Sequence, residues 1–216
     1  MKYSLGIRFI SFWLLLLVLP SVFADSLSPR FTTTLVENSS ANNTPKINKG
    51  VILVATNNLR NSSFKESVIL VTHNTVRGTT GIAINKPSNI PLRQYFPNSE
   101  QVKKYNGHIY YGGPVGSKNI FLLINTEKQQ SGMYRVADGL YFTRGIDLLR
   151  SNIDKYNNED HIRAYAGYAG WGPGQLQNEI DRGDWTIVRS DPSVVFAADQ
   201  ETLWNRLNKS HSGRWI

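Results

Sequence analysis

The sequence predicts one α+β domain, because short apolar runs of strand length come first and amphipathic helical patterns follow them. Three β-rich runs stand close together: residues 50–55 (GVILVA), 67–72 (SVILVT) and 81–85 (GIAIN). No internal repeat and no second change of composition divides residues 49–209. We therefore expect a single domain, with a packed core suited to the 40% hydrophobic content of the chain.

The three runs are expected to form neighbouring strands, with an antiparallel pair joined around residues 75–80. The run GVILVA is continuously apolar, which is typical of a strand buried on both faces. The third strand is expected to stop at Lys86-Pro87, since proline cannot donate a hydrogen bond to a ladder. Apolar spacing in residues 91–105 predicts one or two short helices, interrupted at Pro97.

The rest of the chain alternates between strands and helices. Strands are predicted at residues 108–111, 119–125, 162–169 and 185–188, together with a hairpin from 133–137 to 140–143 that turns at Asp138-Gly139. Helical spacing predicts helices at 145–156, at 176–183 and at 198–207, and Asp191-Pro192 is a suitable start for a further short helix.

The first 24 residues have the three parts of a secretory signal peptide. Lys2 and Arg8 precede an apolar run at residues 9–19, and the small-residue segment VFA ends at Ala24. This run is shorter than the roughly 20 residues that span a bilayer. We expect cleavage after Ala24 and a periplasmic or secreted location, with no membrane span afterwards. The alternatives are an uncleaved anchor, or a cytoplasmic protein whose N-terminus is no signal.

Residues 25–48 are rich in Ser, Thr and Asn and are expected to form a flexible polar leader. The domain then covers residues 49–209, and residues 210–216 form a short C-terminal tail. The net charge is +8, and removal of residues 1–24 would lower it to +6 because Lys2 and Arg8 are lost. Such a modest excess is more typical of a solvated basic face than of a nucleic-acid site.

Metal and thiol chemistry find little support in the sequence. The chain has no cysteine, which excludes disulfides, thiolate metal sites and a cysteine nucleophile. Its histidines show neither i, i+4 spacing nor a neighbouring pair of carboxylates: they are His73, His108, His161 and His211. We therefore predict no metal site and no cofactor.

Catalytic motifs are also missing. No Gly-x-Ser-x-Gly turn is present, so a nucleophile elbow is excluded. The glycine-rich run at residues 112–118 departs from a phosphate loop, because Ser117 precedes Lys118 and Pro114 removes a backbone donor. We predict no catalytic residue and no enzymatic activity; a hydrolase using Ser67 or His73 is the least favoured alternative.

Binding of nucleic acid is not favoured. Basic residues do concentrate between positions 60 and 104, but no helix-turn-helix pattern is visible and most aromatic residues fall at core positions.

Four motifs occur in order along the domain: residues 64–74 (FKESVILVTHN), 81–87 (GIAINKP), 110–115 (YYGGPV) and 167–180 (GYAGWGPGQLQNEI). Together they resemble the bacterial AlgH/YqgE family, and the resemblance extends over residues 50–204. It implies an α+β domain with a small closed barrel-like sheet and flanking helices. It also implies no established enzymatic activity, although members are often labelled transcriptional regulators.

The resemblance also marks a set of motif positions, which we take as candidate binding residues: His73, Asn74, Asn85, Lys86, Gly112, Gly113, Pro114, Trp171, Gly174, Gln175 and Glu179. Two features depart from the family. Relatives typically end the strand after Gly-Gly-Pro in histidine, where this chain has Asn125. The family also looks cytoplasmic, whereas this chain begins with a signal peptide.

These observations predict an exported, non-enzymatic binding or scaffolding module. Its binding face would be formed by His73-Asn74, Asn85-Lys86 and the corner at Trp171, and a protein is the expected partner. The alternative is a cytoplasmic transcriptional regulator, which requires that the N-terminus is not a signal peptide.

Overall fold

The computed structural model describes residues 46–155 and 157–212, with side chains described up to residue 209. The predicted signal peptide, most of the predicted leader and residues 213–216 lie outside these ranges. No helix in the described ranges is long and apolar enough to cross a membrane.

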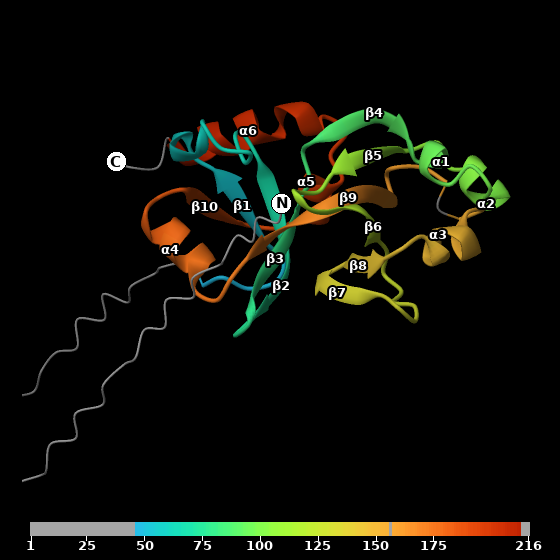
Figure 1. Ribbon diagram of the computed structural model, residues 1–216, viewed down its shortest axis with the longest axis horizontal. Helices are drawn as coiled ribbons and strands as arrows, with labels where there is room; N and C mark the ends of the chain where they lie inside the picture. Colours follow the sequence, from blue (N-terminus) through green and yellow to red (C-terminus); the bar gives the residue numbers. More distant parts are fainter. Residues whose placement is uncertain (1–45, 156, 213–216) are drawn as a thin grey trace, which may run out of the picture. The chain divides into compact units, whose positions relative to one another are not determined.

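A ten-stranded sheet forms the framework of the domain, and its main path runs β10-β1-β2-β3-β9-β6-β8-β7 (Figure 1). Two further strands lie beside this path, since β4 pairs with β5 and β5 pairs with β9. The strands are β1 (Val51–Ala55), β2 (Val68–Thr75), β3 (Gly78–Ala83), β4 (Pro87–Pro91), β5 (His108–Tyr111), β6 (Val115–Asn125), β7 (Tyr134–Ala137), β8 (Leu140–Arg144), β9 (Ile162–Trp171) and β10 (Trp185–Arg189).

The helices are short except for the last. They are the 3-10 turn η1 (Asn57–Leu59) and the helices α1 (Leu92–Tyr95), α2 (Glu100–Lys103), α3 (Asp147–Asn152), α4 (Gln175–Asp181), α5 (Pro192–Val195) and α6 (Gln200–Ser212). The α+β prediction is therefore confirmed.

The prediction of a closed barrel is wrong. Strands β10 and β7 are the two ends of the path, and no pairing joins them in the described chain. The sheet also changes partner along β9, which pairs with β5 through residues 164–166 and then with β3 through residues 169–171. Gly167 stands at this change of partner with φ +72°, and a Cβ there would lie 2.3 Å from the carbonyl oxygen of Gly113. The sheet therefore divides at β9.

The sheet is nevertheless strongly curled. The ring of His73 on β2 lies 6.0 Å from Phe142 on β8 and 6.1 Å from Tyr134 on β7, between ring centroids. Yet β3, β9 and β6 separate β2 from β8 in the strand order. Helices α5 and α6 add Val195 and Leu203 to the cluster enclosed by this curl. In Figure 1, α6 lies at the top, and the β2–β3 hairpin points away from it.

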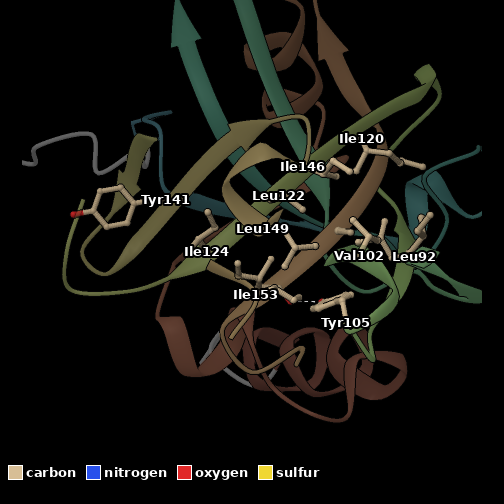
Figure 2. Packing of buried hydrophobic residues seen from close by; sticks show 14 of the residues in the cluster. Leu92, Val102, Tyr105, Ile120, Leu122, Ile124, Tyr141, Ile146, Leu149 and Ile153 are labelled. Carbon is tan, nitrogen blue, oxygen red and sulfur yellow. Dashed lines mark hydrogen bonds between the residues drawn. The ribbon is translucent and has the colours of Figure 1, made fainter. Parts of the chain in front are cut away.

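Three apolar clusters hold the layers together. The enclosed cluster takes Ile52 and Val54 from β1, whereas Leu53 faces the opposite side, with α4 and two tryptophans. Strand β1 is thus buried on both faces, as its continuous apolar run predicts. The third cluster lies under α1, α2 and α3, and Figure 2 shows Leu149 and Ile153 beside Leu122 on β6.

Several element boundaries differ from the prediction. Strand β4 occupies residues 87–91, where a break was expected; two prolines are tolerated because β4 is an edge strand, and the Ser88 hydroxyl donates to the Ile109 carbonyl at 2.7 Å. Strand β3 spans residues 78–83, whereas 81–85 were predicted. Strand β6 begins at Val115, before the predicted start at residue 119. Helix α3 covers only Asp147–Asn152 of the predicted range 145–156. The hairpin of β7 and β8 is confirmed.

Candidate functional site

Two adjoining hollows meet at Lys86 and Tyr111, and we call them together the Lys86 groove. The first has a volume of about 290 Å³ and the second of about 330 Å³. The first is also lined by Glu66, Asn85, Pro87, Glu201, Trp204 and Asn205. The second is also lined by Ser63, Phe64, Ser67, Ala83, Gly113 and Pro114.

Asn85 fixes the floor of the Lys86 groove. It is 5% exposed, its Oδ1 accepts a hydrogen bond from the Val68 N–H at 2.8 Å, and its Nδ2 donates to the Glu66 carbonyl at 2.9 Å. Both ends of the amide are therefore used to hold the segment after β3 against the segment before β2. This explains the polar side chain at the end of an apolar strand, since an unpaired buried amide would be costly.

Glu66 shows backbone strain beside this amide. Its φ is +52°, the left-handed region that residues other than glycine rarely adopt. The Lys86 ammonium donates to the Lys65 carbonyl at 2.9 Å, so it lies against the strained turn. Burial lowers the pKa of Lys86, and the charge of Glu66 opposes this effect. Strain of this kind often collects at ligand sites.

Gly112 shapes the wall of the groove by allowing two strands to approach closely. Its N–H donates to the Ala166 carbonyl at 2.8 Å, and its carbonyl accepts from the Ala83 N–H at 2.8 Å. A Cβ on Gly112 would lie 2.3 Å from the Gly167 carbonyl oxygen. The chain then leaves the sheet through Gly113, which places Pro114 exposed on the wall.

The corner at Trp171 is a closed hydrogen-bond network. Oε2 of Glu179 accepts from Nε1 of Trp171 at 2.8 Å and from Nε1 of Trp185 at 2.9 Å. Oε1 of Glu179 accepts from Nε2 of Gln175 at 2.9 Å. Gln175 and Glu179 lie one turn apart on α4. Gly174 precedes the helix with φ +73°.

The corner supports the groove without lining it. Phe64 stacks on Trp171 with 6.1 Å between ring centroids, and the same Phe64 lines the second hollow. Trp171 is 5% exposed, so most of its surface is used in packing.

His73 and Asn74 lie at the other end of β2. His73 pairs with Thr80 in the ladder, whereas Lys86 follows the far end of β3. Nδ2 of Asn74 donates to the Ile47 carbonyl at 2.9 Å, and its Oδ1 accepts from the Thr79 hydroxyl at 2.7 Å. The structure therefore brings Lys86 together with the Gly-Gly-Pro turn, while His73 lines other hollows.

Sequence reasoning missed two aromatic residues of the groove. Tyr111 is 54% exposed although Ile109 and Tyr110 are both buried, so alternation along β5 gave no signal for it. Trp204 lies on α6, within the range where the last helix was predicted. Its Nε1 donates to the Ala55 carbonyl at 2.7 Å, so the ring is held at the groove edge.

A buried arginine was missed as well. Arg163 is 2% exposed and donates to the carbonyls of Val195, Phe196 and Ala197 at 3.0, 3.0 and 2.9 Å, which caps the C-terminal end of α5. The available signal was a charge within the apolar run at 162–169. Beside it, burial raises the pKa of Tyr110 to about 12.

The described residues contain no group of three His, Asp or Glu side chains that could hold a metal ion. Ser67 lines the second hollow but is only 2% exposed.

Comparison with known proteins gives consistent matches. The sequence model of a family described as AlgH-like matches residues 52–215. A UPF0301 protein of Methylococcus capsulatus is 32% identical over 167 residues, which cover 76% of this chain and 91% of the relative. A UPF0301 protein of Chlorobium luteolum is 29% identical over 170 residues, which cover 77% and 87%.

Two solved structures share the fold. The solution structure of the AlgH protein from Pseudomonas aeruginosa matches with a TM-score of 0.63 at 23% identity, covering 80% of this chain and 92% of that chain. The crystal structure of protein DIP2367 from Corynebacterium diphtheriae matches with a TM-score of 0.64 at 24% identity, covering 76% and 87%.

Proposed function

Since the chain belongs to the AlgH-like family, whose matched relatives carry names that state no activity, we propose that it is an exported, non-enzymatic module that binds a protein partner in the Lys86 groove. The observation that carries this proposal is the junction of the two hollows. There a charged side chain, Lys86, and an exposed aromatic side chain, Tyr111, lie between a polar and a more apolar hollow.

Aromatic side chains held in fixed orientations favour binding of a protein, because they bury a large area with little loss of conformational entropy. Trp204 is held by its hydrogen bond to the Ala55 carbonyl, and Phe64 is held by its stacking on Trp171. Tyr111 stands between them with 54% of its surface exposed. These three rings can act as anchors for an extended segment.

The charges of the groove suggest what that segment presents. Glu66 and Glu201 line the first hollow, and the second contains no carboxylate. A segment with an apolar or proline side chain in the second hollow and a cationic or donor group in the first would complement both. Lys86, at the junction, could then donate to a backbone carbonyl of the segment.

A binding role without catalysis is supported by how the polar groups of the groove are used. Both ends of the Asn85 amide form hydrogen bonds with backbone groups, and the Lys86 ammonium donates to a backbone carbonyl. Ser67 is buried and no histidine lines either hollow. The groove thus presents no serine activated by a neighbouring base.

Export is tested by cell fractionation with N-terminal sequencing. We expect the mature protein to begin at Asp25 in a periplasmic or secreted fraction. An intact Met1 in the cytosol would reject export. Gel-shift at physiological salt would then examine the regulator alternative, for which weak, sequence-independent binding would count as negative.

The groove is tested by photo-crosslinking in cells. A photoreactive phenylalanine replaces Tyr111 or, as a matched control, Tyr134, which is 63% exposed on β7 and lines neither hollow. We expect a defined protein adduct from position 111 that disappears in the Lys86→Ala variant. Equal adducts from both positions, or an adduct indifferent to Lys86→Ala, would refute the groove proposal.

A further inference from the structure

A separate hollow, which we call the His73 hollow, is lined by residues of β2, β3, β6, β8 and β9. Its volume is about 300 Å³. Phe121 and Phe142, which line it, belong to the same enclosed cluster that Val195 and Leu203 of the C-terminal helices complete. Hollows with mainly aromatic walls and a few polar side chains are common places for small ligands.

Aromatic rings give the His73 hollow flat walls. Phe121 and Phe142 stack with 5.3 Å between centroids and 17° between their planes. Tyr168 stands edge-on to Phe121 at 5.9 Å, and His73 stands edge-on to Phe142 at 6.0 Å. A planar, apolar group fits such walls better than a hydrated ion does.

The charge of the lining is positive. Arg144 carries this charge, and the lining contains neither Asp nor Glu. The Arg144 guanidinium donates to Oδ1 of Asn119 at 3.3 Å, and no carboxylate of the described chain forms an ion pair with it. By contrast, Arg135, on the adjoining strand β7, pairs with Asp138. Arg144 therefore retains donors for a ligand.

The His73 ring is oriented by hydroxyl groups. Its Nδ1 lies 3.3 Å from the Thr72 hydroxyl and 3.5 Å from the Thr80 hydroxyl. No described residue forms a hydrogen bond with Nε2. Burial, together with the nearby charge of Lys49, lowers the pKa of His73. The Thr72 hydroxyl donates to the Thr80 carbonyl at 3.2 Å, which leaves the Thr80 hydroxyl as the donor available to Nδ1. An anionic ligand at Nε2 selects the neutral tautomer with its proton on Nε2, where that proton can be donated to the ligand.

We propose that the His73 hollow binds a small organic anion, a carboxylate or phosphate group carried on a flat ring. Arg144 holds the anionic oxygens in a charge-assisted pair, and Nε2 of His73 donates a second hydrogen bond. The ring of the ligand packs against Phe142. A neighbouring hollow of about 490 Å³ shares His73, Thr80 and Tyr168 and leaves room for a larger substituent.

Titration of the ¹⁵N-labelled chain, followed by amide chemical shifts, tests this proposal. The probes are benzoate and phenyl phosphate, with benzamide and inorganic phosphate as controls that lack the charge and the ring respectively. We expect saturable shifts at residues 72–73, 80 and 142–144 with benzoate or phenyl phosphate, and affinities at least about tenfold weaker for both controls. The stronger of the two anions identifies the preferred head group.

Variants separate this site from its surroundings. Arg144→Gln should lower the affinity about tenfold, the effect of one charged hydrogen bond. Arg135→Gln, an exposed change on the next strand, should leave it unchanged, as should Lys86→Ala in the groove of the proposed protein partner. Phe142→Leu should weaken phenyl phosphate more than inorganic phosphate. Non-saturable shifts, shifts centred elsewhere, or equal affinity in a folded Arg144→Gln variant would overturn the proposal.

Discussion

Replacement of Glu179 with alanine should destabilise the domain far more than the exposure of that helix suggests. Oε2 of Glu179 accepts hydrogen bonds from Nε1 of Trp171 and of Trp185, at 2.8 and 2.9 Å. Both indoles are buried, with 5% and 3% of their surface exposed. Without the carboxylate, both buried indole N–H groups lose their hydrogen-bond acceptor, and little water can reach them to replace it.

The magnitude follows from those two bonds. A hydrogen bond to a charged group contributes about 1.5–3 kcal/mol, and partial access of water to Glu179 reduces the sum. We expect Glu179→Ala to lower the free energy of unfolding by about 2–4 kcal/mol. Glu179→Gln keeps a carbonyl oxygen that can accept both bonds, so its cost should be about 1 kcal/mol.

Urea unfolding followed by tryptophan fluorescence and circular dichroism measures these values. Asp181→Ala on the same helix is the control, since Asp181 is exposed and accepts a hydrogen bond from the Gln177 side chain, and its loss should lower the free energy of unfolding by less than about 0.5 kcal/mol. In a Trp171→Phe background, Glu179→Ala should lose about half of its effect. The reasoning fails if Glu179→Ala and Asp181→Ala cost the same, or if the Trp171→Phe background changes nothing.

Three further outcomes follow from the structure. Gly112→Ala should lower the free energy of unfolding by several times the roughly 1 kcal/mol expected for Gly174→Ala. A Cβ at residue 112 would lie 2.3 Å from a carbonyl oxygen, whereas the space at residue 174 is open. Comparison of the two urea midpoints measures the difference. Arg163→Lys should lower stability by about 2 kcal/mol or more, since an ammonium cannot span three carbonyls, and an unchanged melting temperature would contradict this. Burial in the folded state raises the pKa of Tyr110 to about 12. This phenol therefore contributes stability that is complete below pH 10 and is lost as the pH rises through 12. Between pH 10 and 12, the free energy of unfolding of Tyr110→Phe should fall less steeply than that of the unchanged protein.

Local patterns were sufficient where burial alone decides the structure. The apolar run at residues 50–55 predicted β1, and Ile52 and Leu53 do face different clusters. Strand β4 could not be predicted in this way, because its sequence, PSNIP, has little tendency to form a strand. It exists because β5 offers an edge on which Pro87 faces Tyr110.

The candidate site was likewise predicted only in part from the sequence. Motif positions pointed to Lys86 and Pro114, which the structure places around one groove. Tyr111 and Trp204 complete it, and only the packing of α6 against β1 brings Trp204 there. The His73 hollow depends on a curl that brings β2 to β8, and no short-range pattern records that approach.

The position of β1 also determines when the fold can be completed. Strand β1 pairs with β10, from Val51 opposite Arg189 to Ala55 opposite Trp185, and the indole of Trp204 binds the Ala55 carbonyl across 149 residues. A ribosome releases β1 long before either partner, and closing so long a loop costs entropy before any contact repays it. These contacts of β1 therefore cannot form until β10 and the last helix have emerged. This delay is compatible with the proposed export, because an incompletely folded chain can be threaded through a membrane pore and a completed domain cannot.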